Sequence, residues 1–108
     1  MSTRLPGRNY KEVFDRGRSA KGRLLVAWRQ KGSEFEPQAG VVVSKRTFHD
    51  AVGRSRAKRL MREAFRLLVK EESALPSGRW IFIARASMGS AKCGEVKADM
   101  AKVCGRFS

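Results

Sequence analysis

Cations between residues 45 and 70 are the side chains of this sequence best suited to chemistry. A helix turns by about 100° per residue, so Arg59, Arg62 and Arg66 fall on one side of a helix, and Ser55 extends their line by one turn. Like charges three or four residues apart destabilise a helix. A face that keeps them is better explained by bound phosphates than by solvation alone. The candidate residues are Lys45, Arg46, Arg54, Ser55, Arg56, Lys58, Arg59, Arg62 and Arg66.

The sequence has no spacing of His, Cys or carboxylate residues that is typical of covalent or metal-ion catalysis. The chain has one histidine, His49, and two cysteines, Cys93 and Cys104, which stand eleven positions apart in a segment of helical periodicity. That spacing separates them by roughly 16 Å along a helix, which is too far for a disulfide. Four carboxylates of the predicted helices stand beside basic residues, where ion pairs are the simpler explanation: Asp15, Glu63, Glu95 and Asp99. We predict no catalytic residue, no metal held by the chain, and two unlinked cysteines buried as small apolar groups.

The composition points to an acidic partner. The 108 residues include 24 Lys and Arg against 10 Asp and Glu, which gives a formal net charge of +14. Hydrophobic residues make up 42% of the chain, enough for a folded core. No apolar run approaches the roughly 18 residues that a membrane span needs. We expect one RNA-binding domain over residues 1–108, located in the cytoplasm, with no membrane segment and no obligate protein partner.

The apolar periodicity predicts the elements that position these cations. A short first helix is expected from the capping-box spacing of Asn9 and Glu12, with Gly17 in the left-handed conformation at its end. Asp50 is placed to cap the basic helix. The predicted strands are 24–28, 39–43 and 80–84, and the further helices are 51–70 and 91–104. The order α-β-β-α-β-α predicts an α/β fold of the α+β sandwich type, with a small central sheet of three to four strands and helices packed on it.

Aromatic residues divide into two groups. Trp80 and Phe82 belong to a strand that is apolar on both faces, so we place them in the core. Tyr10 and Phe14 lie one turn apart on the first helix and have two interpretations. A two-turn helix must bury an apolar face, and aromatic rings beside cations also stack on single-stranded bases. The pattern alone leaves both interpretations open.

The string at residues 51–66 resembles the signature helix of the bacterial ribonuclease P protein family. Its basic positions match the family pattern one by one, and Ser55 stands where the family usually has Asn. Further segments resemble the end of the family's strand at 43–46, its first helix at 14–17 and its last strand at 81–85, so the likeness covers nearly the whole chain. The loop at 47–50 is one residue longer than the usual pattern and lacks its common Gly. The matched basic positions are Arg54, Arg56, Lys58, Arg59 and Arg62.

This resemblance implies the protein subunit of a ribonucleoprotein endoribonuclease that removes the 5′ leader from precursor tRNA. The catalytic RNA would be its partner and would carry out the chemistry with Mg²⁺, while the chain would hold no cofactor. The implied fold has a left-handed β-α-β crossover, as in the ribosomal protein S5 domain 2-like fold. The basic helix 51–70 would bind the catalytic RNA, and a cleft between the first helix and the sheet would bind the leader. The implied leader contacts are Tyr10, Phe14, Arg18, Lys21, Arg23 and Trp28.

Two other classes of protein share parts of this pattern. A ribosomal protein or another structural RNA binder has the same small size and basic composition, but it would not prefer tRNA precursors that carry a 5′ extension. A DNA-binding protein could lay the basic helix in the major groove, although the sequence has no dimerising heptad and no helix-turn-helix spacing. Preference for leader-bearing precursors therefore distinguishes the family that the sequence resembles from a structural RNA binder.

Overall fold

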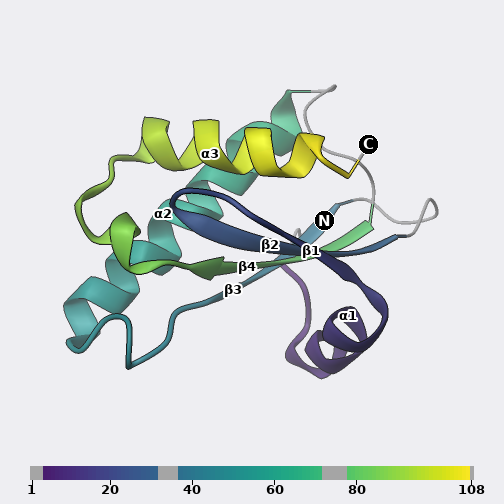
Figure 1. Cartoon of the computed structure of the whole chain (residues 1–108), viewed down its shortest axis with the longest axis horizontal. Helices are drawn as coiled ribbons and strands as arrows, with labels where there is room; N and C mark the ends of the chain where they lie inside the picture. Colours follow the sequence, from purple (N-terminus) through teal and green to yellow (C-terminus); the bar gives the residue numbers. More distant parts are fainter. Residues whose placement is uncertain (1–3, 32–36, 72–77, 108) are drawn as a thin grey trace.

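The computed structural model describes residues 4–31, 37–71 and 78–107 (Figure 1). The Pro, Ser and Gly residues of segments 31–38 and 72–79 predict loops, and these segments fall largely outside the described ranges. Two short 3-10 helices, Gly7–Asn9 and Ala86–Ser90, accompany the main elements. These are α1 (Tyr10–Arg16), β1 (Arg18–Lys21), β2 (Leu25–Lys31), β3 (Gln38–Val42), α2 (Ala51–Lys70), β4 (Gly78–Ala84) and α3 (Cys93–Gly105).

The four strands form one mixed sheet in the order β1-β2-β4-β3. β2 pairs antiparallel with both β1 and β4, whereas β3 and β4 are parallel and are joined through α2. The predicted class, a small sheet of three to four strands with helices packed on it, is confirmed. The sequence pattern did not indicate β1, because its residues Arg18–Lys21 have no apolar alternation and only one of the four is not exposed. A polar, charged strand is typical of a sheet edge.

Helices cover both faces of the sheet (Figure 1). α2 and α3 pack side by side on one face, and α1 lies on the other. The main core lies under α2 and α3, where Trp80 and Phe82 of β4 stack at a ring distance of 5.8 Å and are fully buried. Met61 of α2 and Met100 of α3 close this core from the helix side. The core assignment of Trp80 and Phe82 is confirmed.

A second, smaller apolar cluster lies between α1 and the sheet. Its buried members are Leu5, Val13 and Ile81. Tyr10 packs at its border, against the backbone of β3 at Gly40, where an added Cβ would collide with the tyrosine ring. Glycine at this position therefore allows α1 to approach the sheet closely.

Both cap predictions for α1 are wrong. Asn9 has helical backbone angles and its side chain makes no capping hydrogen bond. Glu12 instead accepts hydrogen bonds from Gln30 Nε2 at 3.1 Å and Arg79 Nη1 at 3.3 Å, and so ties α1 to the sheet. Gly17 is extended, with φ −88° and ψ 175°, rather than left-handed. Glycine is needed there because an added Cβ would collide with two carbonyl oxygens, that of Val13 in α1 and, at 2.6 Å, that of Arg29 in β2.

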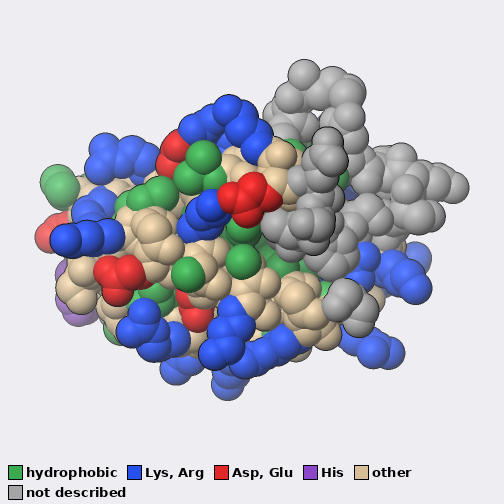
Figure 2. Space-filling view, turned by 90° about the horizontal axis from the view of Figure 1, so that it is seen from above, with side chains coloured by type: hydrophobic (Ala, Val, Ile, Leu, Met, Phe, Trp, Pro, Cys, Tyr) green, Lys and Arg blue, Asp and Glu red, His purple; other side chains and the backbone are tan. Residues whose placement is uncertain are grey.

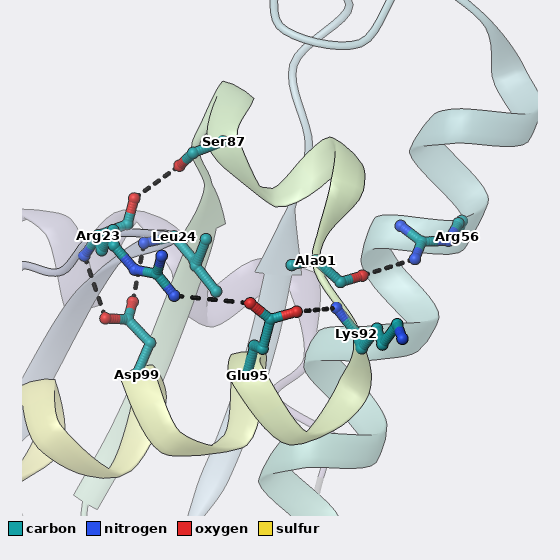
Figure 3. Close-up of polar contacts among 8 residues, drawn as sticks. All are labelled: Arg23, Leu24, Arg56, Ser87, Ala91, Lys92, Glu95 and Asp99. Atoms are coloured by element: carbon teal, nitrogen blue, oxygen red, sulfur yellow. Dashed lines mark hydrogen bonds and ion pairs between the residues drawn. The ribbon is translucent and has the colours of Figure 1, made fainter.

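The starts of the two long helices were predicted with different success. Asp50 caps α2 as expected, because its Oδ1 accepts a hydrogen bond from the backbone N–H of Gly53 at 2.6 Å. α3 begins two residues later than the predicted 91, at Cys93. Its first turn is closed by Glu95, whose Oε1 accepts the backbone N–H of Lys92 at 3.0 Å (Figure 3).

Asp99 of α3 holds the turn between β1 and β2. Its carboxylate accepts the backbone N–H of Arg23 at 3.1 Å and that of Leu24 at 2.9 Å, and the residue is only 9% exposed (Figure 3). The predicted ion pair for Asp99 is therefore replaced by contacts to two backbone amides. Ion pairs are confirmed for Glu95, which lies 3.7 Å from Arg23, and for Glu63, which pairs with Arg66.

Asp99→Ala is expected to lower the free energy of unfolding by about 2 to 4 kcal/mol, because one buried and one partly buried backbone donor lose their charged acceptor. Urea denaturation followed by circular dichroism measures this loss. Asp15→Ala is the control, since Asp15 is exposed on α1 and surface substitutions usually change stability by less than about 0.5 kcal/mol. Equal stabilities of the two variants would contradict the structural role of Asp99.

Candidate nucleic-acid interface

α2 presents its cations on the side away from the core. Ala57, Met61 and Leu68 are buried, whereas Lys58, Arg59 and Arg62, only one or two positions from a buried residue, lie on another side of the helix and are exposed. We call the exposed line the α2 stripe: Ser55, Lys58, Arg59, Arg62 and Arg66. The α2 stripe lines a groove of about 630 Å³ between α2 and β3. In Figure 2, which views the molecule from above the orientation of Figure 1, Lys and Arg side chains outnumber the acidic ones.

The central cations of the α2 stripe are available to a ligand. Within the described part of the chain, the side chains of Lys58, Arg59 and Arg62 make no hydrogen bond or ion pair. Arg66 differs, because it forms an ion pair of 2.5 Å with Glu63 one turn earlier. The hydrogen bond between them raises the pKa of Arg66 and lowers the pKa of Glu63. The cations of the α2 stripe that have no partner among the described residues are therefore those at 58–62.

Two arginines of the predicted interface have structural partners. Arg54 Nη1 donates to the carbonyl oxygens of Phe48 at 2.9 Å and His49 at 3.0 Å, and so orders the loop before α2. Arg56 Nη2 donates to the carbonyl of Ala91 at 2.6 Å and thereby joins α2 to the segment before α3 (Figure 3). Sequence reasoning missed both roles, because backbone carbonyls leave no signature in residue type.

The segment before α2 continues the basic surface. Lys45 and Arg46 are exposed there, and the backbone N–H of Arg46 donates to Ser44 Oγ at 3.0 Å. The amides of Thr47 and Phe48 both donate to the carbonyl of Ser44, at 3.2 Å and 3.0 Å. The loop at 47–50 is thus a hydrogen-bonded turn that holds these two cations close to the start of α2.

The opposite side of the sheet carries partly exposed rings. Phe14 of α1 and Trp28 of β2 meet edge to face with centroids 5.2 Å apart and planes at 80°. We call this surface the aromatic face: Tyr10, Phe14, Trp28, Val42 and Ile83, all partly buried against the second cluster. Tyr10 and Phe14 therefore pack on the sheet and still reach the surface, so the two interpretations of these rings are compatible.

The three cations predicted beside these rings lie elsewhere. Arg18 is in register with Arg29, whose guanidinium lies 5.7 Å above the ring of Trp80 in the main core. Arg18 therefore shares the α3 side of the sheet, away from the aromatic face. Lys21 and Arg23 line a different groove, between the β1–β2 turn and α3. The structure brings the predicted aromatic residues together and places the predicted cations at the β1 edge.

Metal-ligating and thiol groups are scattered. Among residues 4–31, 37–71 and 78–107, no three His, Cys, Asp or Glu side chains are grouped so that they could hold a metal ion. Both cysteines are free, as predicted. Cys104 is buried, and burial raises the pKa of its thiol to about 12. Cys93 is only half-buried, which corrects the expectation that both thiols are core residues.

This small α+β domain has an exposed cationic helix and a separate face of partly exposed rings. The two surfaces are typical of an RNA-binding protein. Residues 4–108 match the family model for Ribonuclease P. The chain belongs to the ribonuclease P protein family, which confirms the resemblance found in its sequence.

Relatives and solved structures support the same assignment. The ribonuclease P protein component of Pseudomonas putida (strain GB-1) is 32% identical over 106 residues, which are 96% of this chain and 76% of the relative. That of Xanthomonas campestris pv. campestris (strain B100) is 35% identical over 82% of this chain and 57% of its own length. The fold matches the RNase P protein of Staphylococcus aureus with a TM-score of 0.80 and 22% identity, over 100% of this chain and 97% of that protein. It matches the RNase P protein of Thermotoga maritima with a TM-score of 0.81 and 22% identity, over 97% of each chain.

The protein is thus the protein subunit of ribonuclease P, the ribonucleoprotein endoribonuclease that removes the 5′ leader from precursor tRNA. Its partner is the RNA subunit, which carries out the catalysis. The alternatives of a ribosomal protein and of a DNA-binding protein therefore do not apply.

Proposed function

We propose that this subunit binds the catalytic RNA through the α2 stripe and binds the 5′ leader of precursor tRNA on the aromatic face. One observation carries the proposal: the two surfaces lie on opposite faces of the sheet, α2 on one and α1 on the other (Figure 1). Each surface therefore remains accessible while the other is occupied. Such a subunit would hold a single-stranded part of the substrate against the catalytic RNA.

The α2 stripe fits the phosphate backbone of folded RNA. Arg59 and Arg62 carry planar guanidinium groups that form paired hydrogen bonds with phosphate oxygens. Their exposure means that little desolvation cost precedes binding. Lys45 and Arg46 extend the same surface beyond the start of α2. In place of the family's Asn, Ser55 supplies a hydroxyl, which has one donor and two acceptor lone pairs.

The aromatic face fits unpaired bases. Single-strand sites stack bases on aromatic side chains in a sequence-tolerant way, which suits leaders of differing sequence. The edge-to-face contact of Phe14 with Trp28 fixes both rings before a base arrives, so little side-chain entropy is lost on binding. Mature tRNA has no leader to occupy this face.

Mg²⁺ would be bound by the RNA subunit and not by this chain. The described carboxylates near the surfaces already have partners in the chain: Glu63 pairs with Arg66, and Glu12 with Arg79. The subunit would supply positive charge and position, while Mg²⁺ on the RNA would supply the ions of phosphodiester cleavage. We place the assembled particle in the cytoplasm. Within the described residues, no helix has the length and apolar character needed to cross a bilayer.

Arg59→Ala and Arg62→Ala are each expected to weaken binding to the catalytic RNA and to reduce its salt dependence. Each change removes one phosphate contact and its released counterion, which lowers the slope of log affinity against log salt by roughly 0.7 to 0.9. Binding titrations of both variants at several salt concentrations measure this slope.

The matched control for this test is Lys92→Ala. It removes the same charge from an exposed residue at the start of α3, outside the α2 stripe. Its slope is expected to stay close to that of the unmodified protein. If the slopes of Arg59→Ala and Arg62→Ala also stayed unchanged, α2 would not be the RNA interface.

A further inference from the structure

A cationic pocket opens at the β1 edge of the sheet, on the side of α3. Its volume is about 810 Å³. Five of the eight residues that line it are cations, and none of the eight is acidic. We call it the edge pocket: Arg16, Arg18, Ser19, Ala20, Arg29, Lys31, Arg106 and Phe107. Such a lining is suited to an anion.

The fold fixes two of these cations firmly. Arg106 Nη1 donates to the carbonyl of Lys21 at 2.7 Å, and Arg29 Nη1 donates to the carbonyl of Phe107 at 3.3 Å. Arg16, Arg18 and Lys31 are exposed at the rim.

The grouping of these cations has an electrostatic cost. Arg18 and Arg29 stand directly opposite each other on β1 and β2, an arrangement of like charges that destabilises a sheet. Burial also lowers the pKa of Arg29, because its charge loses hydration in the fold. The carbonyl of Phe107 and the ring of Trp80 contact this guanidinium. A bound anion would reduce the repulsion between Arg18 and Arg29.

The edge pocket is contiguous with the aromatic face. The rings run from Tyr10, which lies against β3 at Gly40, to Trp28 on β2. The next strand in the same direction is β1, where Ser19 is in register with Trp28. Ser19 also lines the edge pocket. A strand of RNA that crosses the rings in this direction therefore leaves the sheet beside Arg18.

The α2 stripe lies at the opposite edge of the sheet. Its groove is lined by Ala39 and Val41 of β3, and β3 and β1 are the two outer strands. RNA bound along that groove is separated from the edge pocket by the width of the sheet. The leader on the aromatic face is the RNA whose path reaches the β1 edge.

The proposed contact with the catalytic RNA lies at the β3 edge, so the end of the leader nearer the cleavage site is expected on that side. We propose that the edge pocket binds phosphates of the 5′ leader, at nucleotides farther from the cleavage site than those stacked on the aromatic face. This inference rests on the proposed binding of the leader by that face. It gives a function to Arg18, which the sequence resemblance associated with the leader although the structure directs it away from the rings. Arg16 and Lys31 join it as phosphate contacts that sequence reasoning missed.

The test uses the holoenzyme reconstituted with its catalytic RNA and a set of precursor tRNAs whose leaders are lengthened one nucleotide at a time. Arg18→Ala/Lys31→Ala is expected to lower affinity about tenfold for long leaders, since exposed ion pairs are worth about two- to fivefold each. Affinity for short leaders and for mature tRNA should not change. For long leaders the salt slope should fall by about 1.4, twice the single-strand value per phosphate.

Two control variants separate charge from position. Arg18→Lys/Lys31→Arg keeps both charges and is expected to restore most of the affinity for long leaders. Lys70→Ala/Lys92→Ala removes two exposed charges outside the edge pocket and is expected to act equally at every leader length. Circular dichroism confirms that each variant is folded.

The outcomes distinguish this inference from the function on which it rests. If Arg18→Ala/Lys31→Ala weakens all substrates equally, or none, while Phe14→Ala still abolishes the preference for a leader, only the edge pocket proposal is overturned. If the unmodified holoenzyme shows no preference for leader-bearing precursors, leader binding on the aromatic face fails, and the edge pocket proposal fails with it.

Discussion

A holoenzyme carrying Phe14→Ala is expected to bind leader-bearing precursor about 5- to 150-fold more weakly than the unmodified holoenzyme. The factor follows from the value of one stacked base, about 1 to 3 kcal/mol. Mature tRNA should bind as before, because it has no leader to stack on the ring. Equilibrium titration of both RNAs against each holoenzyme measures the difference.

The packing of Phe14 must be separated from its stacking. Phe14 contacts Trp28 and borders the cluster of Leu5, Val13 and Ile81, so its truncation also costs stability. Phe14→Leu is the matched variant, since it retains most of the apolar volume but has no ring. It should be closer to the unmodified protein in urea denaturation and close to Phe14→Ala in its loss of leader binding. Equal losses on precursor and mature tRNA in both variants would mean that Phe14 only packs.

The fold was predictable wherever burial imposes a period on the sequence. α2 shows this well, because Ala57, Met61 and Leu68 recur at helical spacing and are buried in the main core. β1 shows the opposite case. Its strand conformation comes from pairing with β2 at an edge, which places no apolar demand on Arg18–Lys21. Long-range pairing of this kind is not encoded in the local pattern.

Glycine positions were harder to interpret than apolar ones. Gly17 was assigned to a left-handed turn, the commonest use of glycine after a helix. The structure instead needs glycine there because the carbonyls of Val13 on α1 and of Arg29 on β2 both approach it. The approach of Arg29 joins parts of the chain that are distant in sequence, as does the contact between Gly40 and Tyr10. A single sequence shows that a glycine is present, but not which neighbour requires it.

The residues of the candidate site also fall into two groups, those that helix spacing predicts and those whose roles depend on contacts distant in sequence. The positions of Arg59 and Arg62 relative to the apolar residues predict that they lie on the outer side of α2, because the direction of a side chain from a helix depends on helix geometry alone. The roles of Arg54 and Arg56 depend on carbonyl oxygens of loops that pack beside α2. A motif match therefore located the basic helix, whereas the structure separates the arginines that hold loops from those available to RNA.

Cleavage activity is expected to depend on the RNA subunit, with the protein supplying positive charge and position. The isolated chain is expected not to cleave precursor tRNA, whereas the reconstituted holoenzyme cleaves it at low magnesium. At high magnesium the RNA alone should retain part of the activity, because added cations replace part of the positive charge that the subunit supplies. Single-turnover cleavage assays of the chain, the RNA and the holoenzyme across a magnesium series measure these differences.

Single carboxylate substitutions test this dependence on the RNA subunit more sharply. Asp50 caps α2, Glu63 pairs with Arg66, and Asp99 holds two backbone amides, so each has a structural role without any part in the chemistry. Asp15 is exposed on α1. Replacing any one of the four is expected to alter activity only through folding or binding, and to leave the cleavage rate at saturating protein nearly unchanged. Arg59→Ala should behave likewise, with activity lost at low protein concentration and recovered at saturation.

Loss of a group that transfers a proton in the transition state lowers a rate by about 10²- to 10⁴-fold, and saturation with protein does not restore it. A folded carboxylate variant that binds the catalytic RNA normally but loses cleavage to this extent would place part of the active site on the subunit. Asp15→Asn is the most informative of these variants, because Asp15 makes no hydrogen bond or ion pair within the described residues that its removal would disturb. An unchanged rate for that variant, with normal substrate binding, would support a chemical step that depends on RNA and magnesium alone.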